Sequence, residues 1–112
     1  MRARTATVVA VVLAALVGTQ LANAAVRRVA FTANVRPGDE ASLTVAVSPA
    51  ARCSITVTYD TTVSHARGLG RKSGGRLTWR WTVGTSTHAG RWPVVVNCGK
   101  SGILRLKLHV VS

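Results

Sequence analysis

Two stretches decide the fold of this chain: Cys53-Ser54-Ile55-Thr56-Val57-Thr58-Tyr59 and Trp92-Pro93-Val94-Val95-Val96-Asn97-Cys98. In both, apolar side chains recur at every second position, which is typical of a strand with one buried face. An antiparallel alignment with the cysteines opposed gives the facing pairs Cys53/Cys98, Ile55/Val96, Val57/Val94 and Tyr59/Trp92. This one register places both sulfur atoms and the apolar side chains on the same face of the sheet.

The chain has two cysteines, and they permit only one intramolecular disulfide. Closing a loop of roughly 45 residues would stabilise the folded state by about 4 kcal/mol, because the crosslink restricts the unfolded chain. The alternative is a pair of reduced, buried thiols. The sequence favours the disulfide, because the N-terminus carries an export signal.

That signal occupies residues 1–24, which we predict to be a signal peptide cleaved after Ala24. Arg2 and Arg4 give a positive start, Val8 to Val17 is uncharged and apolar, and Ala22-Asn23-Ala24 fits a cleavage site. The apolar run is shorter than the ~20 residues of a membrane span. The alternative is an uncleaved anchor, which would be the only membrane attachment. We therefore expect a secreted or cell-surface protein.

Residues 25–112 are expected to form one all-β domain, because alternation continues along the chain and helical periodicity is absent. Pro49 is expected to end the second strand, and Val29, Trp79, Trp81 and Trp92 are expected to point inward. Gly99 to Gly102 reads as a four-residue hairpin loop. The predicted strands cover 29–35, 41–48, 53–59, a short 66–72, 77–83, 91–98 and 103–111.

Four motifs recur in a known group of domains: Pro37-Gly38, Cys53-x-Ile55-x-Val57-x-Tyr59, Trp79-x-Trp81-x-Val83-Gly84 and Gly90-x-Trp92-x-Val94-x-Val96-x-Cys98. Through these motifs the chain resembles the small immunoglobulin-like domains of exported bacterial proteins of the actinobacterial type. The resemblance implies an immunoglobulin-like β-sandwich of six to seven strands with one disulfide, outside the cytoplasm, and it carries over no catalytic residue.

Immunoglobulin-type topology would pair 41–48 with 77–83 in one sheet. It would pair 53–59 with 91–98, and 91–98 with 103–111, in the other. The two cysteines would then lie within one sheet. An antibody domain differs, because its disulfide crosses between the sheets.

The charge balance is strongly basic, with 15 Lys and Arg residues against three acidic residues and a formal net charge of +12. Such a charge favours contact with anionic material, such as teichoic-type polymers, lipid surfaces or nucleic acid. The alternative is that the charge only keeps the domain soluble. Nucleic acid is the less favoured partner, because the tryptophans are expected in the core and leave no platform for stacking bases.

A candidate anionic-ligand surface combines cations from two regions. The outward positions of the last two strands are one source, and the segment before and at the start of the 77–83 strand is the other. Arginine grips phosphate or carboxylate with paired donors. The alternative is a solvated sheet face without a ligand. The candidate residues are Arg91, Arg105, Lys107, His109, Arg67, Arg71, Lys72 and Arg76.

The sequence offers no catalytic, cofactor-binding or metal-binding residue and no evident small-molecule substrate. No His-x-His, Cys-x-x-Cys or Gly-x-Ser-x-Gly spacing occurs. A cluster of His65, His88 and Asp60 within hydrogen-bond reach in a pocket would point to an enzyme. The leading expectation is a non-enzymatic interaction module at the cell surface or in the medium. An anionic-polymer binder is the second hypothesis, and a small secreted hydrolase or inhibitor is the least favoured hypothesis.

Overall fold

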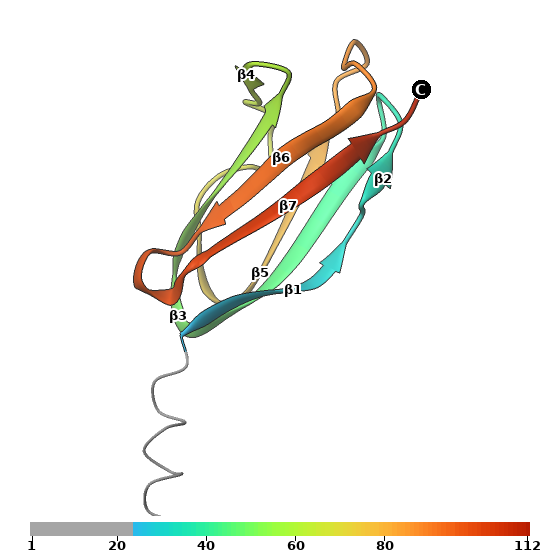
Figure 1. The fold of residues 1–112 in the computed structure, drawn as a ribbon. Helices are drawn as coiled ribbons and strands as arrows, with labels where there is room; N and C mark the ends of the chain where they lie inside the picture. The colour runs from blue at the N-terminus through green and yellow to red at the C-terminus, as the bar shows by residue number, and fades with distance from the viewer. Residues whose placement is uncertain (1–23) are drawn as a thin grey trace, which may run out of the picture.

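The computed structural model describes residues 24–112, and the predicted signal peptide lies almost wholly outside these residues. The described part is mostly β-strand (Figure 1), and none of its helices is long and apolar enough to cross a membrane. Its elements are β1 (Ala25–Phe31), β2 (Asn34–Val35), β3 (Glu40–Tyr59), β4 (Thr62–Val63), β5 (Lys72–Thr82), β6 (Gly90–Asn97), the short 3-10 helix η1 (Gly99–Ser101) and β7 (Ile103–Val110).

The seven strands form one hydrogen-bonded sheet in the order β1-β3-β6-β7-β2, with β4 and β5 also paired to β3. The first half of β3 pairs antiparallel with β1 and β5, the pairing with β5 resumes past the bend from Ala51 to Cys53, and the second half of β3 pairs antiparallel with β6. Figure 1 shows β3 bending between these halves, with β6 and β7 crossing in front of its first half. At the other edge, β2 pairs with β7 in parallel.

The register predicted from the two cysteine-bearing stretches is confirmed. Ile55 pairs with Val96 and Val57 with Val94. Cys53 and Cys98 form the disulfide, with their Cα atoms 4.2 Å apart. A shift of one residue would have moved every buried side chain of these strands to the solvent face, which explains why alternation specified the pairing. The predicted pairing of 91–98 with 103–111 is also present, as the β6–β7 ladder.

Pro49 does not end a strand, which corrects one prediction. β3 continues through it to Tyr59. Between Ala46 and Ala51 the pairing with β5 shifts register, so Pro49 has no partner residue on β5. A proline is tolerated there because its missing N–H breaks no ladder hydrogen bond. This irregular stretch, residues 47–50, is the bend of β3.

The predicted short strand over 66–72 is wrong except at Lys72, where β5 begins. Residues 64–71 form a loop. Gly68 has a φ of 93° and lies against the carbonyl oxygen of Arg80, where a side chain would collide. The indole Nε1 of Trp79 donates a hydrogen bond of 2.7 Å to the Gly70 carbonyl. These contacts hold the loop against β5 in place of ladder pairing.

The first predicted strand is divided, and Val29 is not inward. Its side chain is 45% exposed. The register between β1 and β3 shifts between Arg28 and Ala30, and such a bulge changes which face the following side chains occupy. Val35 is buried as expected, but it lies on the separate strand β2.

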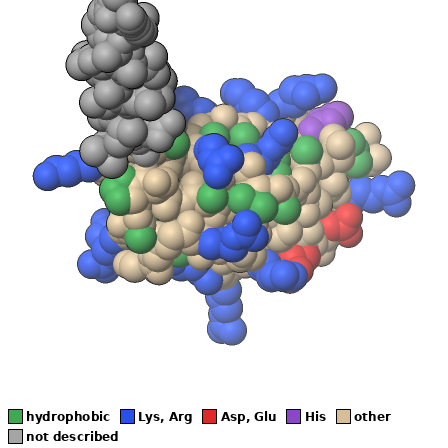
Figure 2. Space-filling model, turned by 90° about the horizontal axis from the view of Figure 1, so that it is seen from below, with side chains coloured by type: hydrophobic (Ala, Val, Ile, Leu, Met, Phe, Trp, Pro, Cys, Tyr) green, Lys and Arg blue, Asp and Glu red, His purple; other side chains and the backbone are tan. Residues whose placement is uncertain are grey.

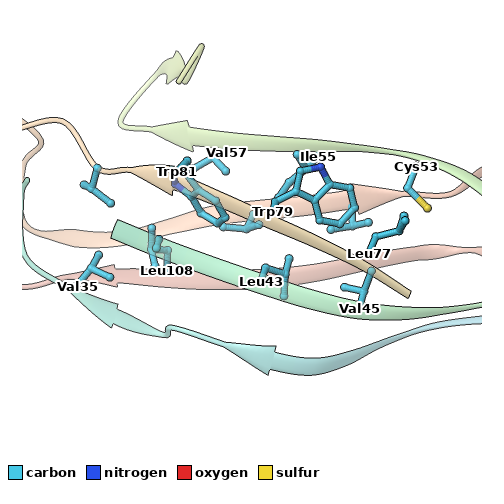
Figure 3. Close-up of a cluster of buried hydrophobic side chains, with 14 of the residues drawn as sticks. Val35, Leu43, Val45, Cys53, Ile55, Val57, Leu77, Trp79, Trp81 and Leu108 are labelled. Atoms are coloured by element: carbon cyan, nitrogen blue, oxygen red, sulfur yellow. The ribbon is translucent and has the colours of Figure 1, made fainter. Parts of the chain in front are cut away.

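The core is built around Trp79 and Trp81, whose side chains are buried as predicted (Figure 3). Side chains from β3, β5, β6 and β7 all enter this one cluster. The Trp81 indole Nε1 donates a 3.1 Å hydrogen bond to the Tyr59 hydroxyl oxygen. Burial raises the pKa of Tyr59, and the hydrogen bond from Trp81 partly opposes this rise. Trp92 is only partly buried and packs at the margin of the core.

Candidate anionic-ligand surface

Four of the eight predicted cations share one sheet face. Arg105, Lys107 and His109 occupy alternate positions on β7, so their side chains leave the same side of the strand. The ladder sets Arg91 of β6 directly opposite His109. The intervening leucines of β7 are more buried, which places the four basic side chains on the outer side. We call Arg91, Arg105, Lys107 and His109 the cationic face.

The other four predicted cations lie elsewhere. Arg67 and Arg71 belong to the 64–71 loop, and Lys72 and Arg76 belong to β5. β5 pairs with β3 and not with β6 or β7. All four side chains are exposed. The structure therefore divides the predicted surface into two parts instead of gathering it on one face.

The three acidic side chains lie at the end of the molecule opposite the bend of β3, and each has a partner there. Asp39 accepts a 3.2 Å hydrogen bond from the backbone N–H of Arg36. Glu40 lies 3.8 Å from Arg80. Figure 2 shows acidic side chains close together at one end, with Lys and Arg side chains spread over the visible face. Within residues 24–112, most of the exposed Lys and Arg side chains therefore have no acidic side chain beside them.

Asp60 carries the third carboxylate and pairs with His88. Its Oδ2 lies 2.9 Å from the Nδ1 of His88, and the two side chains are 49% and 78% exposed. His65 makes no hydrogen bond to either of them in the part of the chain that the structure describes. The three-residue cluster that would have pointed to an enzyme is therefore reduced to one exposed pair. Within residues 24–112 no group of three or more potential ligands could hold a metal ion.

A hollow of about 250 Å³ opens beside the disulfide. It contains one of the predicted cations, Arg71, and one cation that was not predicted, Arg52. The register that pairs Ser54 with Asn97 also sets Arg52 next to the loop after Cys98. The strand register predicted from the sequence could therefore have identified Arg52 as a residue of this site. The lining residues are Arg52, Cys53, Ser54, Arg71, Asn97 and Gly99.

Comparison with known proteins returns no match, because no family model fits the chain and no curated protein resembles it significantly.

Proposed function

We propose that this chain is an exported, non-enzymatic immunoglobulin-like module that acts by binding, at the bacterial cell surface or in the medium. The observation that carries the proposal is the strand pairing. β5 pairs mainly with the first half of β3 and also with Ala51–Cys53, β6 pairs with the second half of β3, and β6 pairs with β7. These pairs are among those expected of an immunoglobulin-type sandwich, and they support the proposal. That all these strands share one core supports two packed layers.

The disulfide supports the proposed location. Disulfides persist in oxidising compartments and are rare in the cytosol. The bridge joins neighbouring strands β3 and β6, whereas an antibody domain links its two sheets. The bridge therefore links β3 and β6 covalently at the end of their paired segment, next to the irregular bend of β3. Cleavage of the signal peptide after Ala24 remains a prediction of the same proposal.

The cationic face favours a more specific role as a binder of anionic envelope polymer. Arg105 and Lys107 are exposed on alternate positions of one strand, so a linear polyanion lying along β7 could reach both. Contacts of this kind release counterions, and the affinity falls steeply as salt rises. A protein partner held by apolar contacts would remain bound at the same salt concentrations.

The experiment is a binding assay of the purified protein against envelope fractions and isolated teichoic-type polymer at low and physiological salt. Arg105→Gln with Lys107→Gln should weaken polymer binding about 3- to 30-fold at low salt, because each exposed charge pair contributes about 0.3–1 kcal/mol. Arg27→Gln with Arg28→Gln removes the same charge from β1 and should leave most of the affinity. Equal losses of polymer affinity in both variants would mean that only the net charge of the protein matters. The cationic face would then not be a binding site.

A further inference from the structure

We propose that the hollow between Arg52 and Arg71 is a binding site for a phosphate group. It is distinct from the cationic face and can bind whether or not that face does. None of its lining residues belongs to β7. Four observations carry the proposal: where the side chains point, what hydrogen bonds they can offer, how their charge is balanced, and how rigidly the walls are held.

The strand register sets the side chains of the hollow on the outer surface. Cys53 is buried, so its neighbours Arg52 and Ser54 point the opposite way, out of the core. Asn97 is the partner of Ser54 across the β3–β6 ladder and shares its face. Arg71 comes from the other side, one residue before the Lys72 that pairs with Cys53. Three chain segments thus converge on one opening.

The groups around the opening are mainly hydrogen-bond donors. The two guanidinium groups can only donate, and Ser54 adds a hydroxyl. The Oδ1 of Asn97 already accepts a 2.9 Å hydrogen bond from the backbone N–H of Gly99, which leaves the side-chain amide N–H groups to donate. Such a set suits the oxygens of a phosphate group, because arginine can hold them with paired N–H donors.

The charge of the two arginines is not balanced within the chain. The sequence contains three acidic side chains, and these lie against the Arg36 backbone, Arg80 and His88. Neither arginine of the hollow forms a salt bridge in the described residues, and residues 1–23 contain no Asp or Glu that could supply one. An anion bound between the two guanidinium groups would relieve their mutual repulsion.

The walls of the hollow are covalently joined. Cys53 stands between Arg52 and Ser54, and Cys98 stands between Asn97 and Gly99, so the disulfide links the β3 wall to the β6 wall. A Cβ added at Gly99, which also lines the hollow, would meet no atom within 4 Å, so the space beside this residue is open. A site held in its bound shape avoids the entropy cost of ordering it.

The hollow also lies at the end where the described chain begins. Ala25 pairs with Ser48 at the bend of β3, and the Ser101 hydroxyl of η1 donates a 2.7 Å hydrogen bond to the Pro49 carbonyl at the same bend. If residues 1–24 were retained as an anchor, the hollow would be near the membrane surface. A lipid headgroup is therefore one source of the phosphate, and a soluble phosphate compound is the other.

The test titrates the purified protein with inorganic phosphate, following backbone and arginine side-chain N–H signals by NMR. We expect saturable shifts at Gly99, Arg52 and Arg71. Arg52→Gln with Arg71→Gln should weaken phosphate binding at least tenfold, and Arg27→Gln with Arg28→Gln, which removes the same charge from β1, should leave it nearly unchanged. All these side chains are exposed, so melting temperatures should be preserved and will be measured for each variant.

A matched pair at Gly99 tests the site without removing an arginine. Its φ of 61° is in the left-handed region, which Asn and Asp tolerate better than other side chains do. Gly99→Asp would place a carboxylate beside the two guanidinium groups and should abolish phosphate binding. Gly99→Asn has the same shape without the charge and should keep it. Equal behaviour of these two variants would contradict an electrostatic site.

A second arm uses phosphatidylcholine vesicles with and without phosphatidylglycerol. Cosedimentation that requires phosphatidylglycerol and is lost in the Arg52/Arg71 variant identifies a lipid headgroup as the source. Shifts with inorganic phosphate, without vesicle binding, identify a soluble phosphate compound. No saturable response in either arm, or an equal loss in the Arg27/Arg28 control, would overturn the proposal.

Discussion

Removing the Cys53–Cys98 disulfide gives the sharpest test of the fold. The two cysteines are 45 residues apart, and closing a loop of that length lowers the entropy of the unfolded chain by an amount worth about 4 kcal/mol. Small domains are stable by roughly 5–15 kcal/mol, so this is a large share of the total. For a domain of this size, 1 kcal/mol shifts the melting temperature by about 4–8 °C. We therefore expect a fall of about 15–30 °C.

The assay is thermal unfolding of the wild-type protein and of a Cys53→Ala with Cys98→Ala variant, each with and without a reducing agent. Reduction should lower the wild-type melting temperature and should not change that of the variant. The variant also loses two buried sulfur atoms, so it should melt slightly below the reduced wild type. An identical wild-type melt in both buffers would refute the loop-entropy reasoning, because the same contacts would then be equally stable without the crosslink.

Two further substitutions test contacts in the core and in the 64–71 loop. Tyr59→Phe leaves the buried Trp81 indole N–H without its acceptor and should cost about 1–3 kcal/mol by urea unfolding, whereas an unchanged midpoint would mean that another acceptor replaces the hydroxyl. Burial raises the folded-state pKa of Tyr59, so the neutral phenol stabilises the fold fully below pH ~10, and this stabilisation is lost as pH rises through the folded-state pKa. The Tyr59→Phe variant should lack this part of the loss of stability at alkaline pH. Gly68→Ala should destabilise the protein by ~1–3 kcal/mol because the residue has a positive φ. The collision of the added Cβ with the Arg80 carbonyl should add to this loss. The control Gly70→Ala, where a Cβ meets nothing within 4 Å, should be close to neutral, and a similar loss in both variants would count against the packed loop.

The parts of the fold that could be predicted from sequence are those where periodicity and a covalent constraint agree. Alternation around Cys53 and Cys98 fixed the β3–β6 register because any other alignment separates the sulfurs or exposes the apolar face. Alternation alone also predicted the burial of Trp79 and Trp81. Neither inference needed long-range information beyond the two opposed cysteines.

The errors fall where the backbone departs from regular pairing. Pro49 reads locally as a strand end, and only the register shift against β5 shows that its missing donor is harmless there. Val29 fits an inward row until the bulge in β1 turns it outward. The segment before Lys72 has strand-like spacing, but the packing of Gly68 and the bond from Trp79 to Gly70 depend on β5 being in place. Such effects are tertiary and leave no local pattern.

The candidate sites show the same division. The sequence predicted that Arg105, Lys107 and His109 share a face, because strand periodicity sets that without further knowledge. It did not select Arg52. The β3–β6 register could have placed Arg52 beside the loop after Cys98, but its approach to Arg71 depends on the packing of the 64–71 loop. Sequence spacing between these two arginines carries no period, since a loop separates them. The hollow is thus a product of topology.

The pairing of β2 with β7 has a mechanical consequence. The two strands are parallel, with the His109 and Val111 N–H groups bonded to the Ala33 and Val35 carbonyls at 2.8 Å each. The chain enters at the bend end and leaves past Val110 at the opposite end (Figure 1). Tension applied between the two termini would load these bonds together, in shear, instead of opening them one at a time. A module attached through its N-terminus and pulled from its C-terminus would therefore resist extension at this small strand pair.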